Sequence, residues 1–173
     1  MIIFSITITP RLQYIADFIR REIGVTELRL AANIDEYKNS GSQKINYSNE
    51  KIISDEFWIC PHTLLFEKEI RQQNTECFEI NNNKAFFKTE GDFPFDIFAA
   101  SFYLLSRYEE YLLHQKDMYG RYAHENSMAF KEHFLHLPLI NIWLREFRKA
   151  LQVKFTNCQL PTANFSYLPT YDI

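Results

Sequence analysis

The stretch IIFSITITPRLQYIADFIRREIG, which runs from Ile2 to Gly24, decides the fold class. Its first part, up to Ile8, carries apolar residues at positions 2, 4, 6 and 8, and this period of two is typical of a β-strand. Thr9 and Pro10 then offer an N-cap and a first helical residue, and Gly24 offers a helix end. Apolar residues between them recur on one helical face. The stretch predicts a strand followed by an amphipathic helix.

Strand and helix patterns alternate along the rest of the chain. The other predicted strands are short and bounded by turn residues, and they span residues 27–32, 44–47, 57–60, 77–80 and 85–88. Three further helices are predicted from apolar spacing, at residues 63–71, at 95–115 and from Pro138 onward. We therefore expect an α/β fold, with a mixed sheet of about five or six strands, helices packed on it and a helical second half.

The domain organisation is expected to change near the end of the chain. Residues 1–155 are predicted to form one N-terminal α/β domain, because 173 residues suit one core better than two. Residues 156–162 are polar and contain Pro161, as linkers do. Residues 164–173 then become strand-like. We expect residues 156–173 to be a linker and the first strand of a second, truncated domain.

Composition excludes several functions. The chain is 46% hydrophobic and 16% aromatic, which indicates a packed globular core. Its net charge of -3, with no basic stripe, argues against nucleic acid as a partner. No signal peptide and no apolar run long enough for a membrane span are visible. Three irregularly spaced cysteines, Cys60, Cys77 and Cys158, are typical of reduced thiols, so we expect a cytoplasmic protein.

Charged residues gather in the second half of the predicted helix at 95–115. Glu109 and Glu110 are sequence neighbours, so on a helix their side chains diverge by about 100° and do not face one substrate together. Structural ion pairing with Arg107 is the favoured interpretation, and a polar patch that faces a partner domain is the alternative. Arg107, Glu110 and Arg121 are the candidates if this chain contributes to a neighbouring site.

The histidines do not define a metal site. His133 and His136 would share a face if they lay on a helix, but two ligands are not a site and the sequence places no third. A glycine-rich phosphate loop and a nucleophile elbow are both absent from the sequence. We therefore predict no metal and no cofactor in this chain.

Aromatic residues near Gly120 offer a different kind of site. Tyr119 and Tyr122 lie in a polar loop, where exposed rings stack on sugars in some proteins. Core packing is the commoner use of aromatic side chains. Tyr119 and Tyr122 are kept as candidate carbohydrate-binding residues.

Four stretches of the chain resemble one known group. They are ITPRLQYI at 8–15, KINYS at 44–48, FDIFAASFYLLSRYEEY at 95–111 and LPTYDI at 168–173. They resemble the N-terminal region of polysaccharide-deacetylase-like proteins of Bacteroidetes, over nearly the whole chain. The stretch from Phe102 to Tyr111 is the most specific part of the resemblance.

The resemblance implies chemistry beyond this chain. The domain that follows in such proteins is similar to the NodB-like carbohydrate esterases, which open with Thr-Phe/Tyr-Asp-Asp-Gly and use a divalent metal. Thr170, Tyr171 and Asp172 match the start of that motif, and Ile173 stands where the metal-binding Asp belongs. By this resemblance Asp172 would be a general base for metal-assisted hydrolysis of an N-acetyl group, acting only together with the missing C-terminal domain.

The expected function is therefore that of a non-catalytic accessory domain. It would position a C-terminal deacetylase-like domain of the same chain that acts on a cell-envelope or surface polysaccharide, with a divalent metal in that domain. A carbohydrate-binding module that uses Tyr119 and Tyr122, and a dimerisation domain, are the two alternatives.

Overall fold

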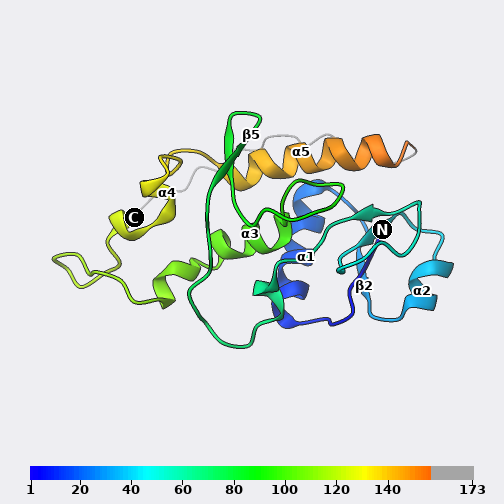
Figure 1. Cartoon of the computed structure of the whole chain (residues 1–173), viewed down its shortest axis with the longest axis horizontal. Helices are drawn as coiled ribbons and strands as arrows, with labels where there is room; N and C mark the ends of the chain where they lie inside the picture. The colour runs from blue at the N-terminus through cyan, green and yellow to red at the C-terminus, as the bar shows by residue number, and fades with distance from the viewer. Residues whose placement is uncertain (157–173) are drawn as a thin grey trace, which may run out of the picture.

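Four short parallel strands form the main sheet of the molecule. The computed structural model describes residues 1–156 (Figure 1). The sheet has the order β2-β1-β3-β4, with β1 at Ile2–Phe4, β2 at Arg29–Ala31, β3 at Lys44–Asn46 and β4 at Phe57–Trp58. Two more strands pair as a separate antiparallel hairpin. The predicted α/β class, the six strands and the helical second half are confirmed, with the strands divided between two sheets.

Strand β1 is central and is buried on both faces, as inner strands of parallel sheets are. Ile3 joins the large core beneath the main helices, whereas Ile2 and Phe4 face a small cluster with Tyr37 on the other side. The prediction that this strand continues to Ile8 is wrong. The chain turns after Phe4, where the Ser5 hydroxyl donates to the Thr7 carbonyl at 3.0 Å, and Ile6 is left 71% exposed.

Helix α1 (Pro10–Ile23) confirms the helix predicted from the opening stretch. The Thr9 hydroxyl accepts a hydrogen bond from the Leu12 N–H at 3.1 Å, and Gly24 closes the helix at a φ of 74°. The same hydroxyl donates to the Leu65 carbonyl at 2.6 Å. The start of α1 is therefore tied to the segment that follows β4.

Short helix α2 (Ile34–Asn39) was not predicted from the sequence. The Asn33 side chain accepts from the backbone N–H groups of Asp35 and Glu36, at 2.8 and 3.0 Å. Tyr37 is its one buried residue, and its ring lies 5.3 Å from that of Phe4. One aromatic anchor and one capping residue are enough to hold so short a helix, but they do not produce a periodic apolar pattern.

The hairpin consists of β5 (Phe78–Ile80) and β6 (Asn83–Ala85). Asn81 and Asn82 form a two-residue turn with φ values of 50° and 62°, a left-handed pair that suits such turns. The second strand therefore starts two residues earlier than the predicted 85–88, because the turn needs only two of the three asparagines.

Two predicted helices are much shorter than expected, and one contact explains both. The helix predicted at 63–71 is a single 3-10 turn, η1 (Thr63–Phe66). The helix predicted at 95–115 divides into α3 (Ile97–Leu105) and the 3-10 turn η2 (Tyr108–Tyr111), with Arg107 at a φ of 52° between them. The Tyr108 hydroxyl accepts from the Arg71 N–H at 3.0 Å and donates to the Arg71 carbonyl at 3.2 Å. This tertiary contact engages the Arg71 N–H that a helix at 63–71 would donate to the carbonyl of residue 67, and Tyr108 makes it directly after the turn at Arg107.

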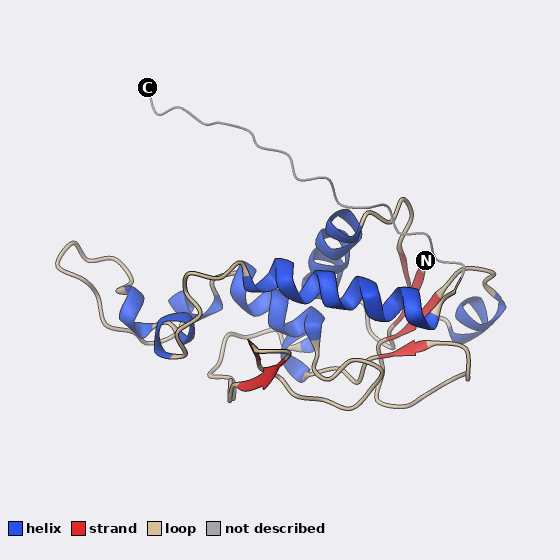
Figure 2. Cartoon of the chain, turned by 90° about the horizontal axis from the view of Figure 1, so that it is seen from above, coloured by secondary structure: helices blue, strands red, loops and turns tan. Residues whose placement is uncertain are grey.

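Helix α5 (Leu139–Lys154) confirms the helix predicted from Pro138 and lies parallel to the long axis of the molecule (Figure 2). Its buried face meets α1 and α3 over a core rich in aromatic rings, which includes Phe86, Phe93, Phe95, Phe98, Trp143 and Phe147. At the end of the molecule opposite α2 lie η3 (His124–Asn126) and α4 (Met128–Lys131). Within residues 1–156, no helix has both the length and the apolar character needed to cross a membrane.

Candidate functional site

Residues 115–123 form a protruding arm at one end of the molecule (Figure 1). An antiparallel bridge pairs Lys116 with Tyr122, and the chain reverses between them. At the base of the arm, the Asn126 side chain accepts from the Gln115 N–H at 3.1 Å and donates to the Gln115 carbonyl at 2.8 Å. The arm is therefore an ordered hairpin, although the sequence predicted only a polar loop there.

The turn at the tip of the arm is built around Asp117. One oxygen of its carboxylate accepts from the N–H groups of Tyr119 and Arg121, at 2.8 and 2.9 Å, and the other accepts from the Arg121 guanidinium at 3.0 Å. These bonds, the Arg121 backbone bond foremost, lower the pKa of Asp117. Gly120 completes the turn at a φ of 78°. Polar bonds therefore order the tip without any help from burial.

Large apolar side chains are concentrated on the outside of this region. Leu113 is fully exposed, Met118 is 88% exposed and Tyr119 is 71% exposed. Of the thirteen large apolar residues that are exposed in the described part of the chain, seven lie between residues 111 and 137. An ordered backbone that presents apolar side chains to solvent is a usual feature of a surface that binds another molecule.

The predicted binding residues lie in this region but do not converge on one point. Arg107 pairs with Glu110, as expected from structural ion pairing. The Arg121 guanidinium lies 4.7 Å from the centre of the Tyr119 ring and also pairs with Asp117. The Tyr122 ring instead lies against His114, with the ring centres 4.9 Å apart. Asp172, the predicted general base, lies outside the described residues.

A polar pocket of about 280 Å³ lies behind the base of the arm, and Tyr122 and Glu109 are among the residues that line it. The Tyr122 hydroxyl is buried and has no hydrogen-bond partner among the described residues. Burial, and then the nearby charges of Glu109 and Glu110, raise the pKa of Tyr122 to about 12. Glu109 turns inward and accepts from the Met128 N–H at 2.8 Å, and burial raises the pKa of its carboxyl. The two neighbouring glutamates therefore do diverge, as their spacing predicted.

The histidine pair is not arranged as a helical pair. His133 follows α4 with a φ of 61°, and His136 lies in the turns before α5, so the shared helical face is absent. In residues 1–156 no three His, Cys, Asp or Glu side chains gather as a metal site. Cys60 and Cys77 are free thiols, and burial raises the pKa of Cys77 to about 11. Cys158 lies outside the described residues.

A second candidate site lies at the carboxyl ends of β1 and β3 and is called the crevice here. It is a hollow of about 230 Å³, lined by Ser5, Ile6, Thr7, Tyr47, Ser48, Asn49, Pro61, Thr63 and Phe66. The chain leaves β1 toward β2 on one side, and later enters β3 on the other side of β1. The crevice therefore occupies the topological switch point of the sheet, where open parallel sheets usually bind ligands.

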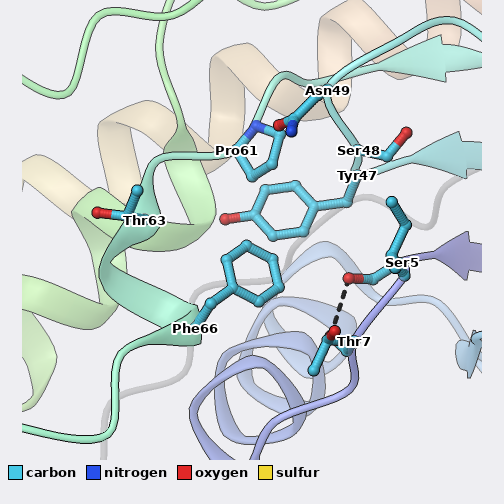
Figure 3. A pocket seen from close by; sticks show the side chains of 9 residues that line it. Ser5, Thr7, Tyr47, Ser48, Asn49, Pro61, Thr63 and Phe66 are labelled. Atoms are coloured by element: carbon cyan, nitrogen blue, oxygen red, sulfur yellow. Dashed lines mark hydrogen bonds between the residues drawn. The ribbon is translucent and has the colours of Figure 1, made fainter.

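The floor of the crevice is aromatic and its position is fixed by buried bonds. Figure 3 shows the Tyr47 ring between Pro61 and Phe66, with Ser5 and Thr7 facing them from the end of β1. The rings of Tyr47 and Phe66 stack with their centres 5.9 Å apart. The Tyr47 hydroxyl donates to Asp96 at 2.6 Å. This bond holds the ring in place, since both partners are buried.

Asp96 is itself a buried carboxylate with several donors. Besides Tyr47, the N–H groups of His62 and Ala99 donate to it, at 2.7 and 2.9 Å. Burial outweighs these bonds and raises the pKa of Asp96 to about 6. Asp96 thus caps α3 and connects the loop after β3 to the loop after β4, from which Tyr47 and Pro61 enter the crevice.

A buried polar network orders the other side of the crevice. The Ser48 hydroxyl donates to the Asn46 side chain at 2.6 Å, and Asn46 donates to Glu56 at 2.8 Å. The Tyr37 hydroxyl donates to the second oxygen of Glu56 at 2.8 Å. Because every member has a partner, the network specifies one conformation for the loop that carries Ser48 and Asn49.

A comparison with family profiles matches residues 1–156 to DUF7033, a family of unknown function. The chain belongs to the DUF7033 family. No curated protein and no solved structure matches the chain. The match to DUF7033 covers every residue of the arm and of the crevice, so both are parts of the DUF7033 domain.

Sequence reasoning missed the crevice of this DUF7033 domain. Its polar residues follow directly after two strands, with Ser5 after β1 and Ser48 and Asn49 close behind β3. The signal was present as small polar residues just after each of these two strands. The prediction of a strand that reached Ile8 hid it, because that strand included Ser5 and Thr7.

Proposed function

We propose that this DUF7033 domain is a non-catalytic accessory domain of a cytoplasmic polysaccharide-deacetylase-like protein, and that its arm docks on the deacetylase-like domain that follows in the same chain. The substrate would be a cell-envelope or surface polysaccharide, and any divalent metal would be held by the second domain. The proposal combines the resemblance of residues 95–111 and 168–173 with the geometry of the arm.

The observation that carries the proposal is the preordered tip of the arm. Asp117 holds the turn through its bonds to Tyr119 and Arg121, so little conformational entropy is lost when the tip binds. Met118 and Tyr119 stand on that turn and are mostly exposed. Aromatic and methionine side chains on an ordered protrusion are typical of the centre of a protein interface.

The candidate polar residues support a structural role more than a catalytic one. Arg107 is paired with Glu110, and Arg121 with Asp117, on the surface of the domain. Glu109 is engaged by the Met128 N–H. These side chains order the backbone around the arm, which is what a docking element needs.

The test compares hydrogen exchange in this chain with exchange in the parent protein that contains the following domain. We expect backbone amides of residues 117–121 to exchange more slowly in the parent, because docking would exclude water from the tip. Met118→Asp in the parent should restore the faster exchange. Val153→Asp is the matched control, since Val153 is 81% exposed on α5, away from the arm.

Equal exchange at the tip in both proteins would contradict docking through the arm. Hydrolysis of acetylated sugars by the isolated chain would contradict the non-catalytic role. Slower exchange that appears in the isolated chain only as its concentration rises would favour the dimerisation alternative, which sedimentation at several concentrations would then confirm.

The carbohydrate-binding alternative rests on Tyr119. Its ring is 71% exposed, and Arg121 lies over one face at 4.7 Å, so the other face is open to stack on a sugar. Titration with chitin-type oligosaccharides tests it. Binding that is lost in Tyr119→Ala would favour this alternative over docking.

A further inference from the structure

We propose that the crevice at the carboxyl ends of β1 and β3 binds one neutral sugar ring. This inference is independent of the docking role of the arm, because the two sites lie on different elements and share no residue. Either can fail without affecting the other.

The position of the crevice is the first argument. The order β2-β1-β3-β4 places the switch point between β1 and β3, where the connections leave in opposite directions and their loops separate. The loop after β1 supplies Ser5 and Thr7, and the loop after β3 supplies Ser48 and Asn49. The hollow thus follows from the topology of the sheet.

The size and charge of the crevice limit its ligand. Its volume of about 230 Å³ lies below the ~300 Å³ at which pockets for drug-sized molecules begin, so one ring fits better than a nucleotide. None of the nine lining residues carries a charged side chain. An anionic ligand would lose its hydration without gaining a cation, so a neutral ligand is favoured.

The lining combines an apolar wall with hydroxyl and amide groups. Pro61 and Phe66 form the partly exposed wall on either side of the buried Tyr47 ring, and a sugar ring presents apolar C–H faces that suit this wall (Figure 3). Ser5 is fully buried and its hydroxyl donates to the Thr7 carbonyl, so it holds the end of β1 in place beneath the rim. At the rim, the Thr7 hydroxyl and the Asn49 amide are exposed, and no hydrogen bond from either to another described residue is present.

The lining is ordered before any ligand binds. The Tyr47 hydroxyl is held by Asp96, and the Ser48 hydroxyl is held by Asn46. Ligand binding would therefore need rearrangement only of the rim. A rigid floor with free polar groups at its edge is the arrangement that favours a small ligand with many hydroxyl groups.

The test is an NMR titration of the ¹⁵N-labelled 173-residue chain with D-glucose, D-galactose and N-acetyl-D-glucosamine. We expect saturable shifts of the Thr7, Ser48 and Asn49 amides for at least one sugar, with a dissociation constant on the order of 1 mM. Thr7→Val should weaken binding about tenfold by removing one hydroxyl. Asn49→Trp should abolish it by filling the entrance, and both positions are exposed, so folding should be preserved.

Thr26→Val is the matched control, since Thr26 is also exposed but lies outside the crevice, and it should bind as the unaltered chain does. Three results would overturn the inference. They are the absence of saturable shifts at the crevice, tighter binding of glucose 6-phosphate or adenosine than of any neutral sugar, and shifts confined to Tyr119 and its neighbours.

Discussion

The sheet end of this DUF7033 domain and its arm place apolar and polar groups in opposite ways. Around the sheet, rings such as Phe98 and Phe147 are fully buried, and the polar residues Asp96 and Glu56 are buried with them and hydrogen-bonded. In the arm, Asp117 orders the backbone on the surface, and Met118 is exposed to solvent. Burial determines the conformation of the sheet end, and local hydrogen bonds determine the conformation of the arm.

This difference separates stability from function. A buried ring contributes to the free energy of unfolding, because its removal leaves a cavity. An exposed ring on an ordered turn contributes little to the free energy of unfolding, so we expect it to contribute to binding when a partner is present. Substitutions at the two ends should therefore change different measured quantities.

The largest effect is expected in the aromatic core. Phe98 is fully buried, and its ring lies 5.1 Å from that of Tyr47. Phe98→Ala should lower the free energy of unfolding by about 3–5 kcal/mol, whereas Tyr119→Ala in the arm should change it by less than ~0.5 kcal/mol. Urea unfolding measures both. A cost for Tyr119→Ala as large as that for Phe98→Ala would contradict the division between the two regions.

Glycines in the two regions give the second comparison. Gly91 has a φ of 142°, and a Cβ there would lie 2.5 Å from the Trp58 carbonyl oxygen. Gly91→Ala should therefore cost about 2–3 kcal/mol, because strain and a backbone clash add. Gly120→Ala in the arm meets only an unfavourable φ and should cost about 1 kcal/mol.

Gly41→Ala is the control for both glycines, since nothing lies within 4 Å of its Cβ position and its φ is not positive. It should be neutral or slightly stabilising. Thermal unfolding should show the largest loss of stability for Gly91→Ala, a smaller loss for Gly120→Ala and no loss for Gly41→Ala. A larger loss of stability for Gly120→Ala than for Gly91→Ala would mean that the arm contributes more to global stability than a surface turn does.

A smaller effect is expected from the pH dependence of the sheet end. Asp96 has a folded pKa of about 6, above its ordinary 3.8, so the folded state holds its proton more tightly than the unfolded state. The stabilising contribution of Asp96 to the free energy of unfolding is fully present below pH 3.8 and is lost as the pH rises through 6. When the pH is lowered from 7 to 5, the free energy of unfolding of the unaltered chain should rise by about 1 kcal/mol relative to that of Asp96→Asn.

One measurement separates the effect of Asp96 from that of other titrating groups. Burial lowers the pKa of His62, so its contribution changes in the opposite direction, falling as the pH drops below its ordinary 6.5. A ¹³C titration of the Asp96 carboxyl reports that residue alone. A midpoint near 4 would contradict the argument that burial outweighs the three donors.

The parts of the fold that the sequence predicted are those with local causes. Helix α1 follows from Thr9, Pro10 and Gly24, which lie within or beside it. The extents of η1 and α3 were wrong because the Tyr108 hydroxyl bonds to the backbone of Arg71, a contact between residues 37 apart in the sequence. Periodicity reports which residues are apolar, but it does not report which distant backbone group a tyrosine will reach.

The candidate sites show the same limit. The Arg107–Glu110 pair was predictable because its members are three residues apart. The crevice was not, because Ser5, Asn49 and Phe66 come from separate segments of the chain that only the strand order brings together. The arm was predicted as a polar loop because its order depends on one Asp and one Gly, which turns of many kinds share.

The smallest effect on global stability is expected from Asp117, although its local effect should be clear. Asp117→Ala removes the acceptors for the Tyr119 and Arg121 N–H groups, so these amides should exchange faster by on the order of tenfold, while global unfolding stays unchanged. Asp117→Asn keeps one acceptor oxygen and should restore much of the protection.

If docking needs the preordered tip, Asp117→Ala in the parent protein should also weaken protection of residues 117–121, whereas Asp117→Asn should not. Equal exchange in the unaltered chain, in Asp117→Ala and in Asp117→Asn would mean that the tip is held by something other than the Asp117 carboxylate. The argument from preorganisation would then fail.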